Sequence, residues 1–212
     1  MNRTQSKHDK HREVLVLDKI KYLEIDVRYI EAIINSNSHQ AYHNVQHLYT
    51  VALRAFSGGI YHEFGFRQQR VLFLAALLHD IAHTGSGDVC DSVNVEISSN
   101  TAKSLLKDDN SFTEKEKNMI VDLILGTDNH NHVFSQNKMQ HILNDADIMQ
   151  VFEDDRDVWI DRLADEKQES ITIESSIQFL ESQTPLSEWG AGVFKRNIPR
   201  LKSLVSSFPG VL

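Results

Sequence analysis

Apolar residues recur at three- and four-residue intervals along most of the chain, which is the spacing of an amphipathic helix. Residues 71–78 are apolar on every side, as is typical of the central helix of a bundle. Gly58 and Gly59 are expected to end the second helix, and Pro199 is expected to kink or divide the last one. The spacing predicts helices over residues 16–35, 44–57, 67–83, 91–107, 113–125, 139–152, 157–166, 170–181 and 187–207. The pattern therefore predicts an all-α fold in the form of a single compact helical bundle.

The same pattern predicts the domain organisation. Residues 1–15 are mostly polar with mixed charge, so we expect a flexible N-terminal lead-in, followed by one domain over residues 16–212. The 212 residues include only nine glycines and three prolines, which argues against a turn-rich β architecture.

The composition of the chain limits which partners and which cellular compartment we expect. A formal net charge of −8 disfavours non-specific binding to nucleic-acid polymers, which requires a basic surface. The longest apolar run, residues 71–78, is much shorter than the ~20 residues of a membrane span, so we expect no membrane partner. A single cysteine, Cys90, allows no intrachain disulfide and fits a reducing compartment, so we expect a cytoplasmic protein. The oligomeric state stays open, a homo-oligomer included.

Three clusters of histidine and aspartate stand out among the chain's eleven histidines. His43 and His47 are four residues apart, so they share a face if they lie on one helix. His79-Asp80-Ile-Ala-His83 follows the most apolar predicted helix, and Asp145-Ala-Asp147 lies among Ile142, Leu143, Ile148 and Met149.

Burial of these clusters is the reason to expect a metal site. A single helical histidine is usually a hydrogen-bonded core residue, and a His-Asp dipeptide alone says little. A buried imidazole beside a buried carboxylate, however, is costly to desolvate unless the two are paired or bind a cation. Imidazole and carboxylate together suit a divalent metal ion. The three clusters in this order therefore predict a metal site.

The order His, His-Asp, Asp resembles the HD-domain superfamily of metal-dependent phosphohydrolases. The sequence around Tyr42-His43-Asn44 with His47 is similar to the YHNxxH element of cyclic-nucleotide phosphodiesterases and of small predicted bacterial HD hydrolases. Residues 79–83 are similar to the phosphodiesterase HDxxH element. Three further segments resemble the bacterial group: Asn94-Val-Glu96, Thr127-Asp-Asn-His130 and Asn144-Asp-Ala-Asp147-Ile.

The resemblance implies a phosphodiesterase-like bundle and a set of site residues. Four residues correspond to the ligands of the first metal: His47, His79, Asp80 and Asp147. The Ala-Asp-Ile match favours Asp147 over Asp145, which would then orient a ligand or a water. Asp80 also counts as catalytic because it can bridge to a second ion.

The remaining roles also come from the resemblance. His43 corresponds to the general acid that protonates the leaving alkoxide. His83, Glu96 and His130 are candidates to contact a second metal or a substrate phosphate. The cofactor is then one or two divalent ions per chain, with Mn, Mg, Zn, Fe, Co and Ni all compatible. The substrate is a small phosphorylated molecule, foremost a nucleotide or cyclic-nucleotide phosphodiester.

The sequence also departs from the phosphodiesterases. Ser98 and Ser99 stand near the place of their His-His pair, and no residue can be matched to their purine-binding glutamine. Two alternatives to a phosphohydrolase therefore stay open. One is a metal-binding module that senses a nucleotide without turnover, and the other is a di-iron oxygenase of the HD type.

Overall fold

The computed structural model describes residues 6–37, 40–85, 89–128 and 137–207. Within these residues the chain is helical, with no strand, which confirms the predicted all-α class. The elements are α1 (Lys7–Tyr22), α2 (Arg28–Asn37), α3 (Val45–Tyr61), α4 (Phe66–Leu78), α5 (Asp91–Leu106), α6 (Glu114–Leu125), α7 (Lys138–Asp147), the 3-10 helix η1 (Gln150–Phe152), α8 (Arg156–Lys167), α9 (Ile173–Ser182) and α10 (Glu188–Ser207).

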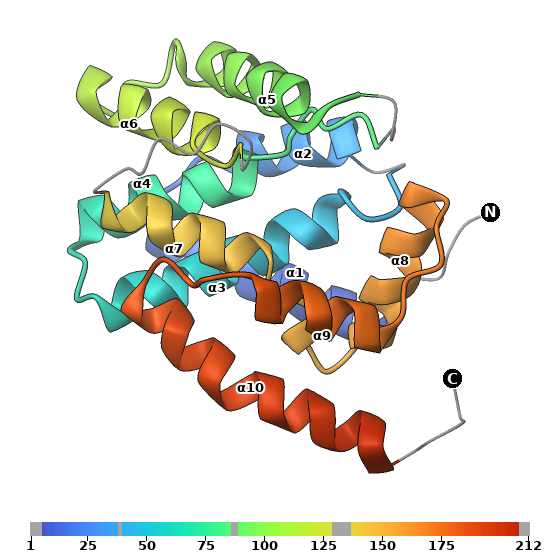
Figure 1. The fold of residues 1–212 in the computed structure, drawn as a ribbon. Coiled ribbons are helices and arrows are strands. Elements are labelled where there is room, and N and C mark those ends of the chain that lie inside the picture. The colour runs from blue at the N-terminus through green and yellow to red at the C-terminus, as the bar shows by residue number, and fades with distance from the viewer. Residues whose placement is uncertain (1–5, 38–39, 86–88, 129–136, 208–212) are drawn as a thin grey trace.

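Helices α3 and α4 form the centre of the bundle. Every residue of α4 from Gln69 to Leu78 is buried, as its uninterrupted apolar sequence predicts. Helix α3 packs against α4, α7 and α1, and α4 also packs against α6. Helices α5 and α6 lie side by side along one edge, while α9 and α10 pack together on the opposite edge (Figure 1).

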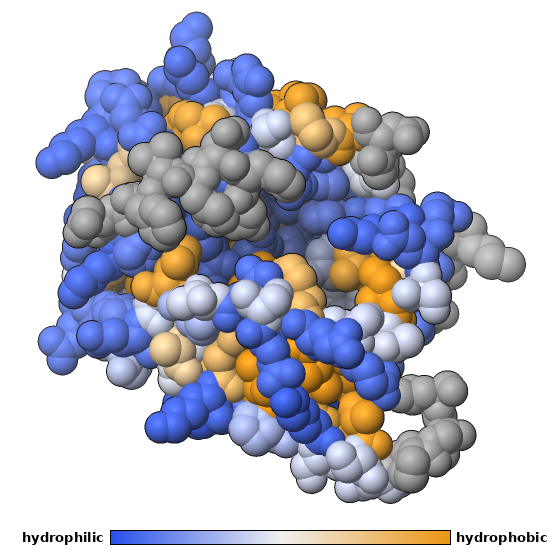
Figure 2. All heavy atoms as spheres, in the orientation of Figure 1, coloured by the Kyte–Doolittle hydropathy of each residue, from blue (hydrophilic) through white to orange (hydrophobic). Residues whose placement is uncertain are grey.

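Helix α8 lies at the periphery, beside η1 and α9 (Figure 1). The space-filling view, drawn in the same orientation, shows a hollow in the middle of the face turned toward the viewer (Figure 2). Apolar side chains lie below this hollow, over α9 and α10. None of the helices in the described part of the chain combines the length and hydropathy needed to cross a bilayer.

The N-terminal region differs from the prediction. Helix α1 begins at Lys7, so residues 7–15 are helical and not a flexible lead-in. The single helix predicted over residues 16–35 is two helices, because Glu24 adopts a left-handed conformation with φ of 53°. Ile25 is buried at this break, and Asp26 Oδ1 accepts a hydrogen bond of 2.9 Å from the Arg28 amide at the start of α2. The apolar spacing continues across the break, which conceals it in the sequence.

The residues expected to end or interrupt helices lie within them. Helix α3 continues through Gly58 and Gly59 to Tyr61, so the predicted helix end there is wrong. A Cβ on Gly58 would lie 2.5 Å from Ile142 Cγ2, and one on Gly59 would lie 2.5 Å from Gln69 Oε1. These glycines therefore permit close packing of α3. Helix α10 likewise continues through Pro199, which is exposed, so water can satisfy the carbonyl left without a donor.

Two other helices are shorter than predicted. Helix α4 ends at Leu78 instead of His83, because the chain tightens into turns in which the Ile81 amide bonds the Leu78 carbonyl at 3.2 Å. Helix α7 ends at Asp147, and η1 follows as a separate turn. Both ends carry predicted site residues, so these terminations determine the local geometry of the site.

The contact at Gly58 yields a stability prediction. Gly58→Ala gains about 1 kcal/mol of helix propensity, but its Cβ would collide with Ile142 and Trp189. Because overpacking a core costs about 1–3 kcal/mol, we expect a net loss of up to about 2 kcal/mol in urea denaturation. The matched control is Gly192→Ala in α10, whose Cβ would meet only Arg196 Nη1 at 3.4 Å. We expect that change to stabilise the protein by about 0.5–1 kcal/mol, and the same sign at both positions would contradict the analysis.

Candidate metal centre

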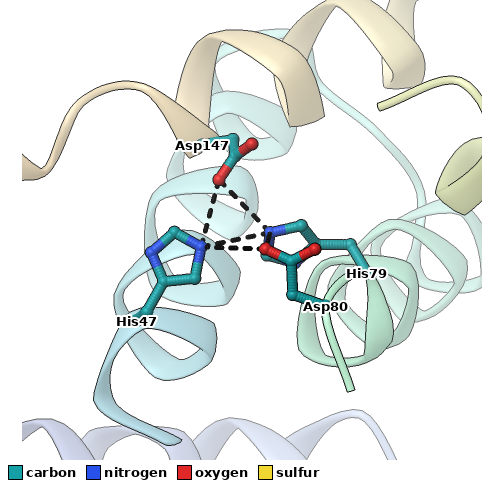
Figure 3. A group of neighbouring side chains, drawn as sticks. All are labelled: His47, His79, Asp80 and Asp147. Carbon is teal, nitrogen blue, oxygen red and sulfur yellow. Dashed lines mark hydrogen bonds and ion pairs between the residues drawn. The ribbon is translucent and has the colours of Figure 1, made fainter. Parts of the chain in front are cut away.

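Four predicted residues converge from three helices (Figure 3). His47 lies in the first turn of α3, whose N-cap Asn44 accepts hydrogen bonds from the backbone of Gln46 and His47. His79 and Asp80 follow the last residue of α4, and Asp147 is the last residue of α7. The ends of three helices therefore direct the four side chains to one point.

The distances between the donor atoms fit a single cation. His47 Nε2 lies 3.3 Å from His79 Nε2 and 3.5 Å from Asp80 Oδ2. His79 Nε2 lies 3.2 Å from Asp80 Oδ2, and both imidazole Nε2 atoms lie 3.2 Å from Asp147 Oδ1. Two ligands at about 2.0–2.2 Å from one ion are separated by roughly 2.8–3.6 Å in octahedral or tetrahedral geometry. The cluster already has these separations.

The protonation pattern also fits a metal ion. His47 and His79 are 1% exposed. His79 Nδ1 lies 2.8 Å from the Ala76 carbonyl and donates to it, so the neutral ring would direct its Nε2 lone pair into the cluster. This is the tautomer that a metal ligand requires, and the carbonyl contact fixes the ring orientation. The chemistry of this buried His₂Asp₂ donor set suits a first-row divalent cation.

The charges of the four residues are strongly coupled. Burial lowers the pKa of His79, but Asp80 and Asp147 raise it by more and hold it well above its usual range. Burial raises the pKa of Asp80, but the adjacent imidazoles outweigh that effect and hold it well below its usual range. The carboxylates thus attract positive charge to this point. A cation there would replace the imidazole protons, because a histidine must be neutral to bind a metal.

A second group adjoins the first and contains a residue that the sequence did not indicate. His43, His83 and Glu166 bring ligand atoms within 4.8 Å of one another. Glu166, from α8, pairs with His43 Nδ1 and accepts backbone hydrogen bonds from Tyr42 at 2.7 Å and His43 at 3.0 Å. His43 Nε2 lies 3.8 Å from Asp80 Oδ2. Burial lowers the pKa of His43, although Glu166 opposes the shift.

Glu166 lies 123 residues after His43 in a helix without a recognisable motif. Its only sequence signal is its place on the same helical face as Trp159. That spacing alone does not distinguish it from the other carboxylates of α8.

The structure also places two of the three residues proposed for a second metal. The His83 ring stacks on His43 with centroids 3.5 Å apart. His83 Nδ1 accepts a hydrogen bond from the Gly85 amide at 3.0 Å, and its Nε2 lies 3.2 Å from the Asn94 amide nitrogen. Glu96 is exposed on α5, and its side chain makes no hydrogen bond or ion pair with any described residue. Asn94, from the same sequence motif, faces the site in its place. His130 lies outside the described residues.

Asp145 has a different environment from Asp147. Its carboxylate is buried and accepts hydrogen bonds from the backbone of Leu186 and Ser187, both at 2.8 Å, and from the Ser187 hydroxyl at 2.6 Å. Asp145 therefore ties the start of α10 to α7 and does not face the cluster, whereas Asp147 does.

A cavity of about 380 Å³ opens beside the cluster. His43 and Asp147 form part of its lining, so it reaches the candidate metal centre. Its opposite walls come from α8 and α9 and are largely apolar, with Trp159, Leu163 and Phe179 among them. Lys167 also lines the cavity. The organic part of a small molecule fits such a site better than a bare inorganic ion does.

Comparison with known proteins gives a weak likeness to solved structures. No family model and no curated protein matches the chain. Among solved structures, the chain is similar to the crystal structure of Bacillus subtilis YpgQ in complex with ADP, with a TM-score of 0.49 and 14% identity, over 87% of this chain and 97% of that chain. A likeness of this size identifies neither a family nor a ligand, so the geometry of the site carries the functional argument.

The contrast between the two aspartates gives a direct test. Asp147→Asn removes a charged ligand, so we expect the purified protein to lose most of its bound metal in elemental analysis. Asp145→Asn should keep the metal and lower the free energy of unfolding by about 1–3 kcal/mol, because it weakens buried hydrogen bonds to a carboxylate. Full metal content in Asp147→Asn, or metal loss in a folded Asp145→Asn protein, would contradict the assignment.

Proposed function

We propose that this chain is a metal-dependent phosphohydrolase of the HD-domain type, which cleaves the phosphoester of a small molecule. The observation that carries the proposal is the convergence of His47, His79, Asp80 and Asp147 on one point beside the His43–Glu166 pair. The motifs around these residues resemble those of HD-domain phosphohydrolases, which supports the same assignment.

Each group has a distinct part in the proposed reaction. His47, His79, Asp80 and Asp147 would hold a divalent ion. Such an ion, when bound, supplies an activated water and neutralises charge on the phosphoryl oxygens. His43 lines the cavity and would protonate the leaving alkoxide through Nε2, which lies 3.8 Å from Asp80 Oδ2. Glu166 orients the ring through Nδ1 and favours its protonated form, so it acts as a positioning residue.

The cavity supports a substrate with a substantial organic part. Its apolar walls suit a nucleobase, and Lys167 supplies a cation in its lining. The proposed substrate is therefore a nucleotide or cyclic-nucleotide phosphodiester, with its phosphate toward His43 and Asp147. This arrangement agrees with the acidic net charge, because recognition of a small nucleotide needs no extended basic surface.

The geometry favours a hydrolase with one principal metal over a di-iron oxygenase. An oxygenase needs a full second set of ligands. His83 Nδ1 accepts a hydrogen bond from the Gly85 amide, and its Nε2 lies 3.8 Å from Asp91 Oδ1. Glu166 is held by His43 and two backbone amides. A sensor without turnover would not need the His43–Glu166 pair beside the metal ligands.

The proposal is tested by elemental analysis of the purified protein, followed by assays with bis-(p-nitrophenyl) phosphate and p-nitrophenyl phosphate. Mn, Mg, Ni, Co and Fe are supplied singly. We expect one or two metal ions per chain and cleavage of the diester. Cleavage of the monoester alone would change the substrate class to phosphomonoesters. Bound metal without turnover of either ester or of nucleotides would favour the sensor, iron-dependent oxygen uptake would favour the oxygenase, and absence of metal would overturn the proposal.

The role of His43 gives a leaving-group prediction. His43→Ala should keep the metal and lower kcat by about 10²–10⁴-fold on a nucleoside ester, whose alkoxide needs a proton. The loss should be much smaller on a p-nitrophenyl ester, whose leaving group departs without one. His62→Ala, at the far end of α3, serves as the control. Equal losses on both kinds of ester would argue against a general-acid role.

A further inference from the structure

Helix α8 carries Glu166 but has little apolar anchoring of its own. Trp159 is the one residue of α8 (Arg156–Lys167) that is buried. Trp159, Arg162 and Glu166 are spaced by three and four residues, so they lie on one face of the helix. Whatever fixes that face therefore also fixes Glu166.

Charged residues from α1 contact the same face. We name Asp9, Arg12, Asp155 and Arg162 the α1–α8 charge network. Arg12 pairs with Asp155, at the N-terminus of α8, and with Asp9 at 3.3 Å. Arg162 pairs with Asp9 at 3.2 Å. Asp9 and Arg12 are 5% and 6% exposed, so these ions are largely withdrawn from water.

Both arginines of the network contact the ring of Trp159. The Arg12 guanidinium is 5.3 Å from the centroid of its ring, and the Arg162 guanidinium is 4.8 Å from it. Cations at these distances are attracted to the face of an indole ring. The α1–α8 charge network thus contacts the one fully buried side chain of α8.

The other end of α8 reaches the candidate active site. Glu166 accepts hydrogen bonds from the backbone amides of Tyr42 and His43 and pairs with the His43 ring. A helix of 12 residues transmits a displacement along its length, because its backbone hydrogen bonds keep it rigid. Loss of the α1–α8 charge network would therefore move Glu166 away from His43.

We propose that the α1–α8 charge network is a positioning device for the active site, with Arg12 as the positioning residue that holds Glu166 against the backbone and ring of His43. Its catalytic consequence rests on the proposed phosphohydrolase function, but its structural consequence does not. Removing one ion from a buried cluster leaves its partners uncompensated, so the remaining charges will rearrange.

The structural consequence is measured by hydrogen exchange at the Tyr42 and His43 amides, followed by NMR. Glu166→Ala removes the acceptor and gives the full effect. We expect Arg12→Met and Asp155→Asn to speed exchange at both amides at least about tenfold, since these hydrogen bonds open locally. Arg70→Met is the matched control, because Arg70 is also buried and lies 4.0 Å from the centroid of the Phe112 ring. It should leave both amides protected.

The catalytic consequence is measured by a double-mutant cycle on bis-(p-nitrophenyl) phosphate with Mn. Arg12→Met should lower kcat about tenfold, as expected when an outer contact orients a site residue. In a Glu166→Gln background the same change should alter kcat less than about twofold, since both substitutions act on one contact. Arg12→Lys keeps the charge and should restore part of the rate.

The outcomes separate the two proposals. Protected amides in both Arg12→Met and Asp155→Asn, or additive losses in the cycle, would overturn the positioning role even if the wild type is active. If the wild type hydrolyses nothing, the proposed function fails, while the exchange result still decides whether the α1–α8 charge network positions Glu166. If Arg12→Met does not fold, as judged by circular dichroism, Asp155→Asn provides the same test with the guanidinium intact.

Discussion

Burial of His79 and Asp80 at the end of α4 is the constraint on which the site depends. Helix α4 is buried on all sides, so its C-terminal end delivers an imidazole and a carboxylate to a place with little water. Leaving such charge without a partner would cost several kcal/mol. His47 from α3 and Asp147 from α7 supply the missing partners, and a bound cation would complete the compensation.

Function would then follow from what surrounds this centre. One side carries His43, whose orientation depends on Glu166 of α8, and the adjoining cavity is walled by α8 and α9. The central helices bear the ligands and are fixed by the core. The peripheral helix α8 bears Glu166 and is joined to α1 by ion pairs. The candidate ligands and the residue that contacts His43 thus come from different layers of the bundle.

The sequence predicted much of this arrangement, and its failures have physical causes. Apolar periodicity identified most of the helices, and the three His/Asp clusters were recognised because each adjoins a buried helix. Glu166 was missed because nothing local distinguishes it from other carboxylates of α8. Gly58 was taken for a helix end because the need for close packing with Ile142 arises only in three dimensions. The choice of Asp147 over Asp145 as a metal ligand came from a motif and stays a prediction, while the structure groups Asp147 with His47, His79 and Asp80.

The most direct test of the central claim is X-ray absorption spectroscopy of the protein loaded with one equivalent of Mn or Fe. We expect nitrogen and oxygen ligands at about 2.0–2.2 Å from the metal, together with outer-shell scattering from two imidazole rings. Replacement of His47 or His79 should remove part of that imidazole scattering. A shell made only of oxygen, without imidazole scattering, would show that the metal binds elsewhere and would contradict the account.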